Sequence, residues 1–159
     1  MPIYSHLRSI DVLEKKLQKK ASQLLKSYQE QPYTEHALLN LAFGYVVFAR
    51  DEYRLFRFLY LERPRVLNLE EDKEMQDSFT SEFGPDSPAY CELQRLKKAG
   101  LERMIQYNWI FTHGLAMLVN AGAFDPASDQ AILTYLKNAG EAFYSWGSKQ
   151  EGSENDDFK

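Results

Sequence analysis

Apolar residues recur every three or four positions along most of the chain, which is the period of an amphipathic helix. No stretch alternates β-branched and polar residues in the way that strands do. The pattern therefore predicts an all-α fold in which about six helices pack as a bundle.

The first two predicted helices lie on either side of Pro32. Ser9 is placed to cap the first, and Thr34 the second. The apolar face of the first carries Leu13, Leu17, Ala21, Leu24 and Tyr28, with its lysines facing elsewhere. The second is apolar from Ala37 to Ala49 except at Asn40 and Gly44, and a helix that is apolar on all sides is buried. We therefore expect this second helix at the centre of the protein.

Two further helices are predicted before Pro88. Asp51 caps a short third helix that ends at Arg63-Pro64, because the residue before a proline is pushed out of the α region. Glu70 to Phe83 forms the fourth, which stops at Gly84-Pro85.

The last two helices are the longest. Ser87-Pro88 starts one that runs, past a kink at Gly100, to Leu118 or Ala121 and closes at Gly122. Asp125-Pro126 or Ser128 opens the final helix, which ends at Gly147. Residues 149–159 are charged and lack periodicity, so we expect a disordered tail.

Composition narrows the function classes. With 159 residues, 44% hydrophobic and 26% charged, the chain resembles an ordinary globular domain, and its net charge of −4 argues against a broad nucleic-acid surface. A single cysteine, Cys91, excludes an internal disulfide and favours a cytoplasmic location. The longest apolar run is too short to span a bilayer, so no membrane association is expected.

We find no residue pattern that indicates an enzyme. His6, His36 and His113 share no metal-ligand spacing, and neither the serines nor Cys91 carry a nucleophile motif, so no metal or cofactor is predicted. His113 stands out because it lies in an apolar helix. It is either a core or interface histidine bonded to a carbonyl, or a group that meets a ligand.

The last two predicted helices contain several small residues, among them Gly114, Ala121, Ala139 and Gly140. An interior glycine costs about 1 kcal/mol of helix propensity relative to alanine, so close packing has to offset it. Either the protein's own core or a two-fold four-helix bundle provides such packing.

Two short segments resemble the TetR (tetracycline-repressor) family. Pro2-Ile3-Tyr4-Ser5-His6-Leu7-Arg8-Ser9 is similar to the end of that family's DNA-recognition helix, and Trp109-Ile110-Phe111-Thr112-His113-Gly114 to a Trp-x-x-x-His-Gly signature in its C-terminal bodies. The resemblance implies a recognition-helix remnant at 1–8, an effector-binding and dimerisation domain at 9–148, and a tail at 149–159.

The family also implies sites. Its dimers form through the last two helices, which here favours a homodimer through Gly114, Leu118, Ala121, Ile132, Tyr135, Ala139, Gly140 and Phe143. A small apolar or aromatic effector is expected among the middle helices, at Phe43, Val47, Phe56, Leu59, Tyr60, Phe79, Tyr90, Trp109 and His113. If a full DNA-binding head is present, the DNA backbone would be touched by Tyr4, His6 and Lys15.

The resulting hypothesis is a transcription regulator, of repressor type, that lacks most of its head and by itself binds no specific DNA sequence. The alternative is a headless helical interaction protein that dimerises or binds an intact regulator without binding DNA. An in-frame helix-turn-helix upstream of Met1 favours the first, and a stop codon there the second.

Overall fold

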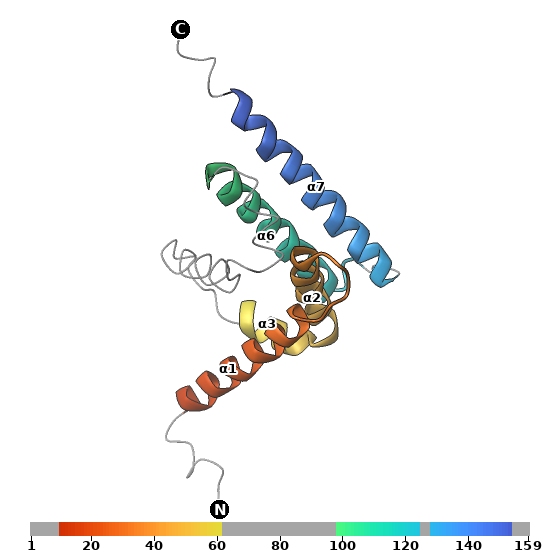
Figure 1. The fold of residues 1–159 in the computed structure, drawn as a ribbon. Coiled ribbons are helices and arrows are strands. Elements are labelled where there is room, and N and C mark those ends of the chain that lie inside the picture. Colours follow the sequence, from red (N-terminus) through yellow and green to blue (C-terminus); the bar gives the residue numbers. More distant parts are fainter. Residues whose placement is uncertain (1–9, 62–97, 125–127, 154–159) are drawn as a thin grey trace, which may run out of the picture.

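The structure is a computed structural model that describes residues 10–61, 98–124 and 128–153. Within these ranges it is all-helical, as predicted, and its helices are α1 (Ile10–Gln29), α2 (Ala37–Asp51), α3 (Tyr53–Tyr60), α6 (Lys98–Asn120) and α7 (Asp129–Ser153) (Figure 1). The helix predicted from Glu70 to Phe83 and the start predicted at Ser87-Pro88 lie outside the described residues.

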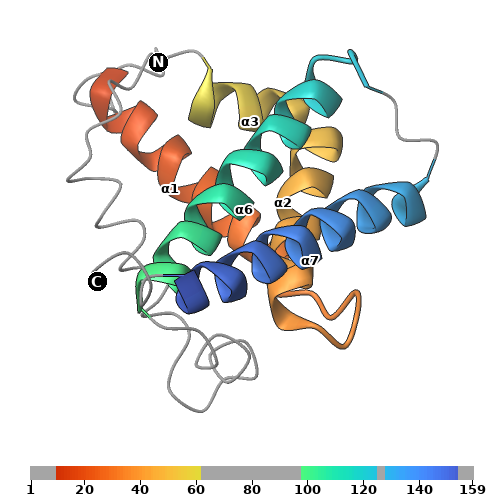
Figure 2. The same ribbon diagram turned by 90° about the horizontal axis from the view of Figure 1, so that it is seen from above.

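Helix α2 is the centre of the bundle, as its uniformly apolar sequence predicts. Every residue from Phe43 to Ala49 is buried, and the helix contacts each of the other four described helices. In Figure 2, α1 lies on one side of α2, with α6 and α7 across its other faces. The burial of Phe43, Val46 and Phe48 alone removes three large apolar side chains from water, each worth about 1.5–3 kcal/mol.

Gly44 allows α1 to cross close to α2. A Cβ atom at this position would overlap the carbonyl oxygen of Tyr28 and lie 2.6 Å from its carbonyl carbon and 2.8 Å from Cα of Gln29. These are backbone atoms, which cannot rotate away. The glycine that interrupts the apolar run is therefore required by the helix crossing.

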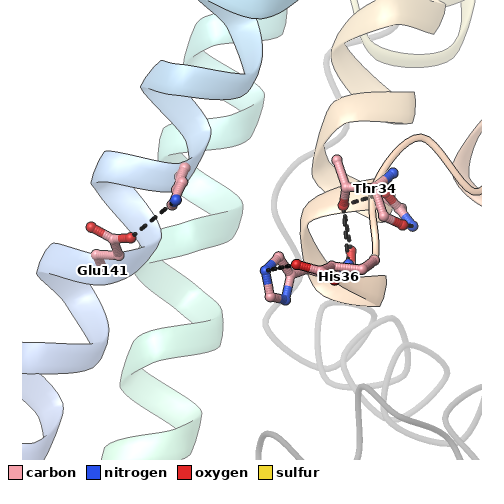
Figure 3. A network of polar contacts seen from close by, with 6 residues as sticks. Thr34, His36 and Glu141 are labelled. Atoms are coloured by element: carbon pink, nitrogen blue, oxygen red, sulfur yellow. Dashed lines mark hydrogen bonds and ion pairs between the residues drawn. The ribbon is translucent and has the colours of Figure 1, made fainter.

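Asn40, the other interruption of that run, closes the loop between α1 and α2. Its Oδ1 accepts from the backbone N–H of Thr34 at 2.7 Å and from the Thr34 hydroxyl at 2.8 Å, while its Nδ2 donates to the Thr34 carbonyl at 2.9 Å. Figure 3 shows Thr34 bonded in this way beside His36. The predicted cap at Thr34 is wrong, because α2 begins after His36 and the Thr34 hydroxyl accepts from the N–H of His36 instead.

The predicted cap at Asp51 is also wrong. Asp51 is the last residue of α2, and α3 follows Glu52 without a side-chain cap. Asp51 bonds instead to Arg50, whose guanidinium also reaches Asp129 at the start of α7, with N–O distances of 2.7 and 2.6 Å. Arg50 therefore ties the end of α2 to the beginning of α7.

Gly122 closes α6, as predicted. It adopts φ of +66°, and the N–H groups of Gly122 and Ala123 donate to the carbonyls of Val119 and Leu118. This is the Schellman pattern, in which a left-handed residue satisfies the last carbonyls of a helix. The helix is continuous in backbone from Lys98 to Asn120, so Gly100 lies inside it.

Ser128, one of the two predicted starts of the final helix, precedes α7, and the end predicted at Gly147 is wrong. Ser128 accepts a hydrogen bond from the N–H of Ala131, which is the geometry of an N-cap. The helix then continues past Gly147 to Ser153, so residues 149–153 are helical rather than part of a disordered tail. A glycine weakens a helix interior by about 1 kcal/mol but does not remove its hydrogen bonds, as proline does.

The second half of helix α1 is the part that enters the core. Ala21 and Leu25 are buried, whereas Ile10, Leu13 and Leu17 on the same side of the helix are 66%, 47% and 39% exposed. Its lysines Lys15, Lys16, Lys19 and Lys20 are exposed. The first turns of α1 thus point away from the bundle (Figure 1).

Candidate functional site

Five rings from three helices meet at one place. Trp109 and His113, one turn apart on α6, face Tyr45 of α2 and the pair Phe56 and Tyr60 of α3. Residues four apart on a helix lie on the same face, which explains how α3 and α6 each present two rings. We call Tyr45, Phe56, Tyr60, Trp109 and His113 the ring cluster.

His113 is the centre of the ring cluster. Trp109 stacks on its imidazole with an interplanar angle of 4° and centroids 5.2 Å apart. Tyr60 approaches the imidazole edge-on at 5.5 Å, and Phe56 lies at 6.1 Å. Phe56 is fully buried and Trp109 is 38% exposed, so the cluster extends from the core to the surface.

Polar contacts also lie inside this aromatic surrounding: the Tyr45 hydroxyl and Nδ1 of His113 are 2.8 Å apart, within hydrogen-bonding distance, and Tyr45 also hydrogen-bonds with the Tyr60 side chain. Burial raises the pKa of the Tyr45 hydroxyl well above its ordinary value, with a further contribution from Tyr60. Burial also lowers the pKa of His113. Both groups are therefore uncharged at neutral pH, and the cluster has hydrogen-bonding capacity without charge.

The structure brings together four of the residues predicted to bind an effector: Phe56, Tyr60, Trp109 and His113. Phe43 instead packs edge-to-face on Tyr33, with centroids 4.7 Å apart. The core also contains Val47, which is buried, and Leu59, which is partly buried against it. Phe79 and Tyr90 lie outside the described residues.

Sequence reasoning missed Tyr45. It also offered a carbonyl as the partner of a structural His113, whereas the structure pairs His113 with the Tyr45 hydroxyl. Tyr45 could have been identified from the rule that a buried hydroxyl in an apolar helix needs a hydrogen-bond partner. The sequence supplied one such hydroxyl in α2 and one imidazole in the apolar part of α6.

A second feature is an exposed apolar surface on α6 and α7. Its residues on α6 are spaced four, four and three positions apart, and its residues on α7 are spaced seven and four positions apart. Each set therefore lies on one face of its helix. Its members, which we call the α6/α7 face, are Ile110, Gly114, Leu118, Ala121, Tyr135, Ala142 and Trp146. Four of them are large side chains that remain between 38% and 53% exposed.

Helices α6 and α7, which carry the α6/α7 face, lie against each other. At one end, Tyr107 of α6 lies against Trp146 of α7, with centroids 5.4 Å apart. At the other end, Phe124 lies against Tyr135 at 5.4 Å. Both views show α6 and α7 running as an antiparallel pair (Figures 1 and 2).

The residues predicted for a dimer interface divide between this face and the interior. Gly114, Leu118, Ala121 and Tyr135 are exposed. Ile132 is fully buried, so it packs within the chain's own core. The remaining three are half-buried: Ala139, Gly140, which approaches Asn108 of α6, and Phe143, which contacts Tyr107 and Phe111.

Of the residues predicted to touch DNA, Lys15 is exposed on α1, and Tyr4 and His6 lie outside the described part of the chain. Among the described residues, no three His, Cys, Asp or Glu side chains are grouped to hold a metal ion. None of the described helices is both long and apolar enough to cross a membrane. Comparison with protein-family models, curated proteins and solved structures finds no match.

Proposed function

We propose that this chain is the effector-binding and dimerisation body of a TetR-like transcription regulator, of repressor type. The observation that carries the proposal is the α6/α7 face, on which Ile110, Leu118 and Tyr135 are about half exposed. Contiguous exposed apolar surface on a small domain is typical of an interaction site.

The occupant that best fits this face is a second copy of the chain. Two antiparallel helices pack on two more in a four-helix bundle, and a two-fold axis makes one patch complementary to itself. The face has small residues between its large ones: a Cβ atom on Gly114 would meet nothing within 4 Å. A partner helix has room to approach at that point.

The ring cluster supports the effector half of the proposal. It combines aromatic walls, uncharged hydrogen-bonding groups and a half-exposed Trp109, which suits a small apolar or aromatic molecule. Helix α6 presents Trp109 and His113 to this cluster and Gly114 and Leu118 to the α6/α7 face. One rigid helix thus belongs to both sites.

Coupling between effector and DNA follows from the same arrangement. The ring cluster includes Tyr45 of α2, and α2 carries the close crossing with α1 at Gly44. An effector that binds one placement of α2 and α6 better than another shifts the population toward that placement. Helix α1, which in this proposal connects to the DNA-binding head, then changes the spacing of two heads in a dimer.

The test of dimerisation compares two exposed leucines. Leu118, on the α6/α7 face, and Leu13, on α1, are 50% and 47% exposed. We expect the wild-type chain to be a dimer at tens of micromolar in light scattering, Leu118→Glu to be a folded monomer, and Leu13→Glu to remain a dimer. A wild-type monomer at that concentration, or equal effects of the two substitutions, would contradict the proposal.

The alternative function, a headless helical interaction protein, is favoured by a separate observation. The first half of α1 leaves Ile10, Leu13 and Leu17 exposed in one stripe, which a protein partner would cover. The two functions differ at the ring cluster, since only a regulator needs an effector there. Binding of an effector that changes the emission of Trp109, and is lost in Trp109→Phe but retained in Trp146→Phe, favours the regulator.

A further inference from the structure

The exposed side of α6 carries no charged residue along most of its length. No Asp, Glu, Lys or Arg occurs from Met104 to Phe124, whereas 26% of the whole chain is charged. Much of this stretch nevertheless faces outward, because its exposed residues on α6 are Gln106, Tyr107, Trp109, Ile110, Gly114 and Leu118. A surface that is depleted of charge and keeps aromatic side chains is typical of the centre of a protein interface.

The side of α7 that belongs to the α6/α7 face is uncharged in the same way. Between Asp129 and Trp146 the charged residues are Lys137 and Glu141. These two form an ion pair at positions i and i+4, and by helical periodicity they lie on a different side of α7 from Tyr135. An uncharged surface can meet a copy of itself without repulsion, so a second copy of the chain fits the α6/α7 face electrostatically.

The ring cluster and the α6/α7 face share a border on α6. Successive residues of a helix are about 100° apart, so Trp109 and His113 form one row along α6 while Ile110 and Gly114 form the next. Residues three apart are neighbours on a helix surface, which places Ile110 beside His113. The side chains of Trp109 and Ile110 are 38% and 53% exposed. The exposed part of the ring cluster therefore adjoins the surface that the proposed function assigns to dimerisation.

The other side of the row formed by Trp109 and His113 is covered. The α6 residues there are partly or fully buried: Ile105, Thr112 and Ala116. Open surface beside Trp109 on α6 thus lies toward Ile110 and Gly114, and a Cβ atom on Gly114 would meet nothing within 4 Å. A partner that packs on Ile110 and fills the space beside Gly114 reaches the exposed edge of Trp109 next.

We propose that a second copy of the chain covers Trp109 together with the α6/α7 face, and that the partner subunit thereby closes the exposed side of the ring cluster. This inference rests on the proposed dimer and effector site. A molecule packed against the indole is then enclosed by two chains, whereas in a monomer the same molecule stays in contact with water. The effector site is complete only in the dimer. Since a ligand that binds the dimer better than the monomer stabilises the dimer, effector binding and dimerisation strengthen each other.

Hydroxyl-radical footprinting with mass spectrometry tests the position of Trp109, because it measures the exposure of individual aromatic side chains without a substitution. The full chain is labelled at tens of micromolar, and again after dilution to a concentration at which light scattering shows monomers. We expect the labelling rate of Trp109 to be at least about twofold lower in the dimer, since the centre of an interface packs as tightly as a protein interior and excludes water.

Two residues of α7 calibrate the measurement. Tyr144 is 40% exposed, close to the value for Trp109, and lies on the opposite side of α7 from Tyr135, so its labelling should not change on dilution. Trp146 belongs to the α6/α7 face and should be protected in the dimer. Leu118→Glu, which the proposed function expects to be a folded monomer, should label at Trp109 at the rate of the diluted wild type.

Each outcome decides a different statement. Protection of Trp109 and Trp146 without protection of Tyr144 supports the closure of the ring cluster. Protection of Trp146 without protection of Trp109 overturns the closure and leaves the dimer of the proposed function in place. Equal protection of all three residues also overturns it, because the protected surface then does not follow the α6/α7 face. A wild-type chain that is monomeric at tens of micromolar removes the proposed dimer, and the closure with it. The dilution series decides these outcomes even if Leu118→Glu does not fold.

Discussion

Gly44 shows how one missing side chain sets the distance between two helices. Gly44→Ala would place a Cβ against the carbonyl group of Tyr28 and 2.8 Å from Cα of Gln29, so α1 and α2 would have to separate. We expect a loss of about 1–3 kcal/mol in the free energy of unfolding, measured by urea denaturation with circular dichroism, because overpacking against backbone cannot be relieved by a rotamer change.

The matched control for Gly44 is Gly140→Ala. Here the added Cβ would lie 3.7 Å from Oδ1 of Asn108, an ordinary contact, and alanine improves helix propensity by about 1 kcal/mol. Gly140→Ala should therefore leave the free energy of unfolding unchanged or raise it. If Gly44→Ala and Gly140→Ala changed the free energy of unfolding by the same amount, the α1–α2 crossing would be looser than the structure shows.

At the scale of elements, Asn120 connects the end of α6 to the junction of α2 and α3. Its Nδ2 donates to the carbonyl of Ala49 at 2.8 Å and to that of Tyr53 at 3.0 Å. Asn120→Ala leaves the Ala49 carbonyl without this donor, and we expect it to lower the free energy of unfolding by about 1–3 kcal/mol.

Asn120→Asp should be more destabilising than Asn120→Ala, because a carboxylate oxygen would face two carbonyl oxygens that it cannot satisfy. Asn138→Asp is the control, since Asn138 is exposed on α7, and its effect should stay within about 0.5 kcal/mol. Urea denaturation of the three variants tests the hydrogen bonds of Asn120 to the Ala49 and Tyr53 carbonyls. An Asn120→Ala variant that is less stable than Asn120→Asp would refute them.

The sequence predicted the helices and which of them is central, but it predicted the first residue of each helix less well. Helix α2 was predictable because its apolar run permits only a central position, and Gly122 because left-handed φ at a helix end favours glycine. Thr34 and Asp51 were misread because a short polar side chain near a helix start has several hydrogen-bond partners within reach, here Asn40 and Arg50.

The sequence did not predict which residues of different helices contact each other. Tyr45 and His113 lie 68 positions apart, and nothing in the local pattern of either helix specifies which face of α2 meets which face of α6. Four members of the ring cluster, Phe56, Tyr60, Trp109 and His113, were predicted to lie together, and Tyr45 was not. The hydrogen bond between Tyr45 and His113 depends on how α2 and α6 pack.

At the scale of the whole molecule, His113 links stability to pH. Its pKa is lower in the folded chain than the value of about 6.5 that it has when unfolded, so below that pH the unfolded state takes up the proton first. The stability contributed by the neutral imidazole is present above pH 6.5 and is lost as the pH falls from there toward the folded pKa.

We therefore expect the free energy of unfolding to fall between pH 7.5 and pH 5.5 in the wild type, and to fall less in His113→Phe. Identical pH profiles for the wild type and His113→Phe would show that the imidazole titrates equally in both states.

The first half of α1 extends beyond the part of the helix that is buried. At 1.5 Å per residue, Ile10 lies about 16 Å beyond Ala21, the first buried residue of the helix. A rotation of α1 by about 5° at Ala21 would move Ile10 by about 1.4 Å. A small change in the angle between α1 and the bundle is therefore largest in its effect at the start of α1, where the proposed function places the connection to a DNA-binding head.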